Sequence, residues 1–382
     1  MKSRSGFSLI ELLIVISVIA ILTTMSVVVL QGVLNQARED ATAMTVTKVG
    51  ELLEERIAAF DRAATGAVLA DEGDQLERDV KRFFGLPNNS VQPRVLRQRV
   101  AELIARKRLF RTFFPQRFAE MVDIKDLTGS PGSNGIPDML EEKLRDASGA
   151  TTFDLTQHDP VTESAELLHF MLNEMAVFGV TPTGADSFTG AEVADTDGDG
   201  LLEFIDAWGN PLRFYRWPTR LIDIDLADTD PATPGRQGDV TSAAPGSGVE
   251  GEREFASLFI RGLAGTNGIT RDPLLVDPDD TIGRIGFEIL RLPNLDQAYN
   301  EAAFHSVDVY HTPLVVSAGS DGVTGLLEPN DVDVNAGRLG NLAMPADGDG
   351  DGVYGELEDI SFLVDAASDN ITNRNRRAGG SN

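Results

Sequence analysis

An uninterrupted apolar stretch at residues 7–30 limits what this chain can fold into more than any other feature. It contains neither glycine nor proline, and its polar side chains are Glu11 and a few small hydroxyls. A helix of about 20 apolar residues is long enough to cross a bilayer. Residues 7–30 are therefore expected to form a transmembrane helix rather than part of a soluble core.

A single carboxylate, Glu11, lies within this stretch. Placing it in hydrocarbon costs about 2.5–3.5 kcal/mol, so the carboxylate is expected to have a cationic partner. If the chain is cut before Phe7, the new α-amine supplies that cation. In a staggered array of identical helices, Glu11 of one copy can neutralise Phe7 of the next, and the ion pair then sets the register of a filament. The alternative is a plain signal anchor in which the acid has no such role.

The junction that precedes the apolar stretch is short and basic. Lys2 and Arg4 are followed by Gly6-Phe7-Ser8-Leu9-Ile10-Glu11, whereas a secretory signal peptide has a longer leader. The pattern resembles the leader of type IV pilins and of the pseudopilins of type II secretion systems. The resemblance implies cleavage between Gly6 and Phe7 by prepilin peptidase and methylation of the new N-terminus. It also implies assembly with copies of itself and other pseudopilins on an inner-membrane platform.

The distribution of charge predicts the orientation in the membrane. Because Lys2 and Arg4 precede the span, the N-terminus is expected in the cytoplasm. The C-terminal domain of this single-pass inner-membrane protein is then periplasmic or part of an extracellular filament. The net charge of −27 argues against general binding to a phosphate backbone, so nucleic acid is not expected as a partner. Since cysteine is absent, no disulfide is available to the exported domain.

Periodicity and composition divide the chain into segments and predict an α+β, pilin-like fold, with a long N-terminal helix packed on an antiparallel sheet. The expected segments are a leader at 1–6, a transmembrane helix at 7–30, its amphipathic continuation at 31–64, a mainly helical insertion at 65–180, a β-rich head at 181–370 and a flexible tail at 371–382. Within them, helices are expected at 95–114, 137–146 and 163–178. Strands are expected at 211–217, 256–261, 284–292 and 307–317.

Two Asp-rich loops match the spacing of calcium-binding loops, with acids at positions one, three and five, glycine at six and an acid at twelve. The first candidate ligand set is Asp195, Asp197, Asp199, Glu203 and Asp206, and the second is Asp347, Asp349, Asp351 and Glu358. Alternate side chains of a tight loop converge on one point, and carboxylates suit Ca²⁺. We therefore predict calcium binding; the alternative is a pair of solvated acidic turns without metal.

Three later segments resemble the major pseudopilin of type II secretion systems. They are Asp206-Ala207-Trp208-Gly209-Asn210-Pro211, Ser317-Ala318-Gly319-Ser320-Asp321-Gly322 and Asp359-Ile360-Ser361. In that family the loop between the last two segments holds calcium, so the resemblance implies Asp321 and Asp359 as ligands. The chain departs from the family at Ala207, where proline is usual, and after Ser361, where a tryptophan is missing. Whether Glu358 and Asp359 would serve the same ion is left open.

Other functions have weaker support in the sequence. Arginines and phenylalanines alternate between Arg94 and Phe118, which suits single-stranded nucleic acid. However, a helix with phenylalanine inward and arginine paired with the acids of this chain is the preferred explanation, since charged helix faces are common. The four histidines are scattered, and no catalytic motif appears, so the chain is not expected to be an enzyme. The main hypothesis is a structural filament subunit that acts on a secreted cargo. The alternatives are a filament-tip protein that binds a surface ligand or DNA, and an exported enzyme tethered by a pilin leader.

Overall fold

The computed structural model describes residues 9–64, 102–117 except 104, 108 and 112, residue 159, residues 161–176, 179–216 and 312–329, and 363–374 except 365, together with Ala346 and Gly350. The predicted elements at 137–146, 256–261 and 284–292 lie outside the described residues.

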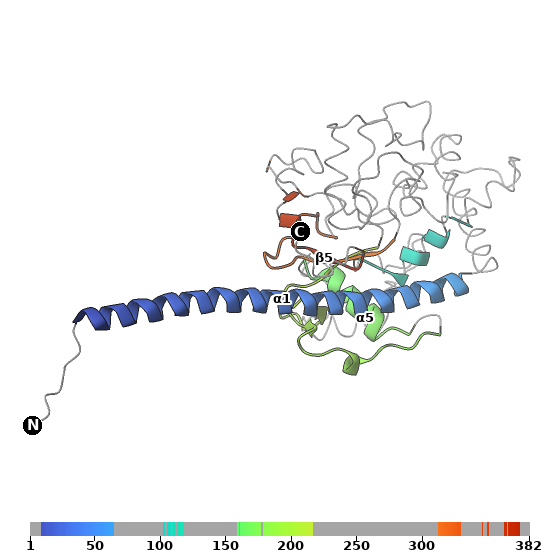
Figure 1. Cartoon of the computed structure of the whole chain (residues 1–382). Coiled ribbons are helices and arrows are strands. Elements are labelled where there is room, and N and C mark those ends of the chain that lie inside the picture. Colours follow the sequence, from blue (N-terminus) through green and yellow to red (C-terminus); the bar gives the residue numbers. More distant parts are fainter. Residues whose placement is uncertain are drawn as a thin grey trace, which may run out of the picture.

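The largest element is the helix α1, Leu9–Ala63, which is continuous through the predicted boundary near residue 30. Figure 1 shows its N-terminal half projecting away from the rest of the described chain. The large apolar side chains between Leu9 and Leu34 are exposed, and the first buried residue of α1 is Thr42. α1 is the one helix in the described part of the chain that is long and apolar enough to cross a membrane.

Small hydroxyl side chains in the apolar half of α1 are satisfied within the helix. Ser17, Thr23 and Ser26 each donate a hydrogen bond to the carbonyl oxygen four residues earlier, at 2.7–2.8 Å. In hydrocarbon, a polar group must find its partner inside the protein. These residues therefore fit the apolar environment that the sequence predicts.

The second half of α1 packs against the head. Val46, Val49, Leu53 and Phe60 follow a spacing of three, four and seven residues and are almost completely buried. Strands β4 (Leu314–Ser317) and β5 (Ile371–Thr372) contact α1 directly. The predicted α+β arrangement, a long N-terminal helix with antiparallel sheet, is thus confirmed.

A three-stranded antiparallel sheet forms the centre of the head. Its order is β3 (Arg213–Tyr215), β4, β5, with Arg213 opposite Val316 and Val316 opposite Thr372. The strands predicted at 211–217 and 307–317 correspond to β3 and β4. A second antiparallel pair consists of β1 (Val193–Ala194) and β2 (Glu203–Phe204).

The start of the predicted tail is instead an edge strand. The prediction of a flexible segment from residue 371 is wrong for its first residues, because Ile371 and Thr372 form β5 and are buried. The Asn373 side chain accepts a hydrogen bond from the backbone of Val315 (2.9 Å). Arg374 pairs with Glu54 of α1 at 3.0 Å. These contacts hold residues 371–374 against α1 and β4.

Helix α5, Glu163–Asn173, lies within the segment predicted as a helical insertion and contributes to the core of the head. All of its residues are buried, and it packs against β2 and β3. The predicted helix extended to residue 178, but α5 ends at Asn173. The Arg56 guanidinium of α1 donates to the carbonyl oxygens of Leu172 (3.0 Å) and Met175 (2.5 Å), which satisfies carbonyl groups at the end of the helix.

The described part of the predicted helix at 95–114 is helical and places its phenylalanines inward. Phe110 and Phe114 are buried and stack at a centroid distance of 4.3 Å. Phe110 also meets Phe60 of α1 edge-on at 5.2 Å. On the same helix, Arg106 pairs with Asp61 at 2.5 Å. The described residues therefore show phenylalanine packing inward and an arginine engaged with an acid of the same chain.

Candidate metal centre

The first Asp-rich segment is the loop of a β-hairpin. It connects β1 to β2, in which Ala194 lies opposite Glu203. The Asp195 carboxylate accepts hydrogen bonds from the backbone N–H groups of Gly198 (2.7 Å) and Gly200 (3.1 Å). Gly200 has φ +94°, a conformation that glycine adopts readily. The loop is thus closed by its own first acid, and glycine allows the turn as predicted.

Two overlapping groups of acids form at this loop. Asp195, Asp197 and Glu203 make up the first group, and Glu166, Asp197 and Asp199 make up the second. In each group the three residues offer one carboxylate oxygen apiece within 4.8 Å of the others. The loop acids are exposed or half-buried, whereas Glu203 and Glu166 are buried. The centre is therefore open to solvent on the loop side and closed on the protein side.

The buried acids of the centre have perturbed acidities. Burial raises the pKa of Glu203 to about 7, and the neighbouring Asp197 carboxylate adds to this increase. The carboxylate of Glu203 also accepts a hydrogen bond from the backbone N–H of Thr196 (3.1 Å), which favours its charged form. Burial, together with the neighbouring carboxylate of Asp199, raises the pKa of Glu166 to about 9.

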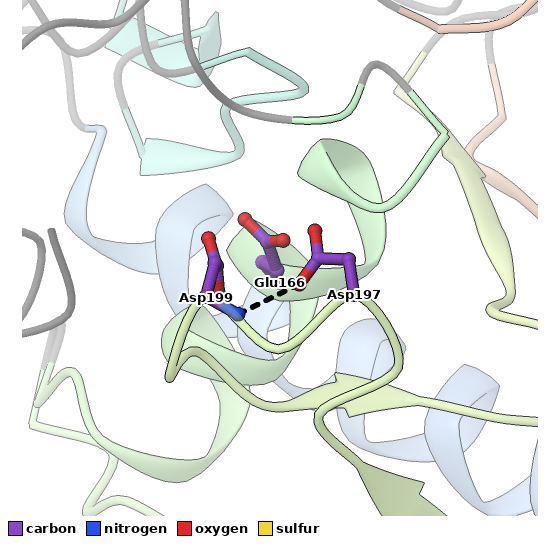
Figure 2. A group of neighbouring side chains, drawn as sticks. All are labelled: Glu166, Asp197 and Asp199. Atoms are coloured by element: carbon purple, nitrogen blue, oxygen red, sulfur yellow. Dashed lines mark hydrogen bonds between the residues drawn. The ribbon is translucent and has the colours of Figure 1, made fainter.

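Glu166 was not among the ligands predicted from the sequence. It comes from α5 and is brought against the loop by the packing of α5 on β2. Figure 2 shows the Glu166 carboxylate between those of Asp197 and Asp199. The available signal was an acid beside Leu167 and Leu168 on the helix predicted at 163–178, but local spacing does not reveal a partner 31 residues away.

The donor set suits a hard divalent cation. Both groups consist of carboxylates, and neither contains histidine or sulfur. Oxygen ligands of this kind are those that Ca²⁺ and Mg²⁺ prefer. Among the predicted ligands of the first loop, Asp195, Asp197 and Glu203 form one group, and Asp199 belongs to the other with Asp197 and Glu166, so the residues present fit such an ion.

Asp206, predicted as the twelfth-position ligand, lies in neither group. Its carboxylate accepts hydrogen bonds from the backbone N–H groups of Trp208 and Asn210, both at 2.9 Å. It also accepts one from the Ser317 hydroxyl at 2.8 Å. The reversal of the chain between Ile205 and Pro211, which form a β-bridge, turns Asp206 toward β4. Its place in the described structure is that of a turn and strand connector.

Two of the segments that resemble the major pseudopilin meet at this connector. Besides the bond from Ser317 to Asp206, the Asn210 side chain donates to the carbonyl oxygen of Gly319 (3.1 Å). Asp321 is exposed and accepts a hydrogen bond from the backbone N–H of Val323 (2.8 Å). It belongs to neither metal-competent group found in the described residues. The predicted ligands outside the described residues are Asp347, Asp349, Asp351, Glu358 and Asp359.

The N-terminal candidate residues belong to the projecting end of the chain. Gly6 and Phe7 lie outside the described residues, and Glu11 lies in the apolar first turns of α1.

Comparison with protein-family models matches residues 1–27 to the prokaryotic N-terminal methylation motif. The chain therefore opens with a prepilin-type signal, as the sequence predicted. This motif implies processing by prepilin peptidase and assembly into pilin-like filaments. Searches of curated proteins and of solved structures gave no match.

Proposed function

We propose that this protein is a structural subunit of a type II secretion pseudopilus or of a related type IV pilus-like filament. The observation that carries the proposal is the coupling of a prepilin-type signal at residues 1–27 to a helix whose apolar first half extends beyond the head. Its role is mechanical rather than catalytic: assembly moves secreted cargo or brings partners together.

The shape of α1 supports this role. The apolar side chains from Leu9 to Leu34 face outward, away from the described head, so they need a surrounding of lipid or of other helices. Before assembly the bilayer provides that surrounding, with the N-terminus in the cytoplasm and the head in the periplasm. In a filament, the same helices from neighbouring subunits replace the lipid, and Glu11 pairs with the processed N-terminus of an adjacent copy.

We further propose that the head binds calcium through the hairpin loop, with Asp195, Asp197, Asp199 and Glu203 as ligands. Asp195, Asp197 and Glu203 form one group of carboxylates, and Asp199 belongs to a second group that shares Asp197. A divalent cation would offset the repulsion within such a group. The ion would hold β1 and β2 together in an exported domain that has no cysteine.

The filament role is tested by the mass of the mature protein from cells with and without prepilin peptidase. Processing predicts the loss of Met1 to Gly6 and the gain of one methyl group on Phe7. A chain that keeps its leader in the presence of the peptidase would contradict the proposal.

A substitution separates filament assembly from membrane anchoring. Glu11→Gln should leave the protein in the membrane but reduce the yield of filaments. Glu39→Gln, which removes a carboxylate beyond the apolar segment of the same helix, is the matched control and should assemble normally. Equal filament yields from both variants would show that Glu11 has no role in register.

A further inference from the structure

Glu166 is a buried acid that has no cationic partner among the residues that the structure describes. The residue is 2% exposed. Neither of its carboxylate oxygens accepts a hydrogen bond from the residues that the structure describes. The hydroxyl of Thr162, one turn earlier on the chain, is directed at Asp197 Oδ2 and at the carbonyl oxygen of Asp159, each 3.0 Å away. A buried carboxyl group without a partner costs free energy, so its presence calls for an explanation.

The charged groups near Glu166 in the described part of the chain make its ionised form still less favourable. They are Asp199, Asp197 and Glu203, and all three are acids. The Glu166 side chain is aimed into the space above the hairpin loop, where it faces Asp197 and Asp199 (Figure 2). One carboxylate oxygen each from Glu166, Asp197 and Asp199 lies within 4.8 Å of the other two. An arrangement of this kind is stable in its charged form when a cation lies among the oxygens.

We propose that Glu166 is a ligand of a divalent cation, best matched by Ca²⁺, that is held between α5 and the hairpin loop together with Asp197 and Asp199. The inference rests on the proposed binding of calcium by the loop. It adds a ligand from outside the loop, and the spacing of the loop acids does not predict this ligand. The cation then cross-links a core helix to the β1–β2 hairpin rather than closing a self-sufficient loop.

The number of protein carboxylates favours Ca²⁺ over Mg²⁺. Ca²⁺ binds oxygens at about 2.3–2.6 Å, so two of its ligands can lie up to about 5 Å apart. The three oxygens meet this limit as they stand. Mg²⁺ keeps several waters and is usually bound by one or two carboxylates, so a set of three protein carboxylates matches Ca²⁺ better. The exposed side of Asp197 gives the cation a path from solvent.

Titration calorimetry tests this inference. The full chain is purified in detergent, treated with a chelator to remove bound metal, and then titrated with Ca²⁺. Three variants are compared with the wild type: Glu166→Gln, Asp195→Asn in the loop, and Glu174→Gln as the control that removes an acid just beyond the end of α5. Glu166→Gln should weaken the affinity at least about tenfold, since the charge count of the ligands sets the affinity of such sites. Glu174→Gln should bind as the wild type does.

Thermal unfolding provides the second readout. Without calcium, Glu166→Gln should melt at or above the wild-type temperature, because an amide replaces a buried acid faced by other acids. With calcium, it should lose most of the increase in melting temperature that the wild type shows. If this variant does not fold, Glu166→Asp, which keeps the charge but withdraws it by one methylene, should bind calcium more weakly than the wild type.

The outcomes separate the two claims about the metal. Suppose that Glu166→Gln binds calcium as tightly as the wild type while Asp195→Asn does not. The loop then binds the ion, and the assignment of Glu166 as a ligand is wrong. If Glu166→Gln does not fold, Glu166→Asp takes its place in this comparison. If the wild type binds no calcium, both the loop site and the inference fail. In either case the filament role is tested separately, by the mass of the mature protein.

Discussion

The stability of the metal-free protein should fall as the pH rises from about 5 to 9, and Glu166 should cause a large part of the decrease. Burial raises the pKa of Glu166 to about 9, whereas an unfolded glutamate titrates at 4.5. Between these values the folded state keeps a proton that the unfolded chain has released. The stabilisation is therefore complete below pH 4.5 and is lost as the pH rises through 9.

The size of this effect follows from the difference between the two pKa values. Each pH unit in the interval changes the free energy of unfolding by about 1.4 kcal/mol, so the full interval corresponds to on the order of 6 kcal/mol. A typical domain has a total stability of about 5–15 kcal/mol, so the change is readily measured. Glu203, with a pKa of about 7, adds a decrease of the same sign between pH 4.5 and 7.

The measurement is urea unfolding in the presence of a chelator at several pH values, for the wild type and for Glu166→Gln. The difference between the two curves isolates Glu166 from the other acids, and it should widen in favour of the variant as the pH rises. Saturating calcium should reduce the wild-type slope, because the bound ion keeps Glu166 charged in the folded state. Parallel pH dependences for the two proteins would refute the reasoning.

Three substitutions test the packing of the head by urea unfolding at neutral pH with calcium present. Phe60→Ala should cost about 3–5 kcal/mol, because it leaves a cavity among buried aromatic rings; a cost below 1 kcal/mol would contradict this packing. Arg56→Met should cost about 1–3 kcal/mol, since the carbonyl of Leu172 loses its donor, whereas Arg56→Lys should lose less. Gly319→Ala should cost about 1–3 kcal/mol, because φ is +67° and the new Cβ would lie 2.5 Å from the Asp369 carboxyl carbon. A neutral effect there would show that the turn is not as described.

Features that depend on local sequence were predictable. The helix α1 follows from an apolar run without glycine or proline, joined to an amphipathic segment whose periodicity is unmistakable. The loop acids converge because alternate side chains of a tight turn point to the same side, and Asp195, Asp197 and Glu203 were all identified from their spacing. In both cases the determining interactions lie within a few residues of one another.

Features that depend on distant contacts were not predictable from one sequence. Glu166 reaches the loop only because α5 packs on β2, and no local pattern encodes this packing. Asp206 fits the calcium-loop spacing equally well, yet the Ser317 hydroxyl and the turn at Asn210 hold its carboxylate elsewhere. Ile371 and Thr372 looked like the start of a polar tail, but β4 provides them with a strand to pair with.

The position of α5 links the candidate metal centre to the anchor helix, and this link gives a last prediction. At one end of α5, Glu166 faces the hairpin loop; at the other, Arg56 of α1 holds the carbonyl oxygens of Leu172 and Met175. Because α5 lies between them, removal of the cation should loosen the packing of the head on α1 as well as the loop itself. Amide hydrogen exchange in α1 should therefore become faster at residues 46–60 when a chelator is added.

The apolar half of α1 provides the internal control for this experiment. The large apolar side chains described between residues 9 and 34 are exposed, and the buried half of the helix separates them from the metal centre, so amide exchange in this segment should not respond to the chelator. A selective response at residues 46–60 would show that the cation stabilises the packing of the head on α1, the helix through which the subunit would assemble into a filament. Faster exchange confined to residues 193–204 would mean that the ion stabilises the hairpin alone, and the link through α5 would have to be abandoned.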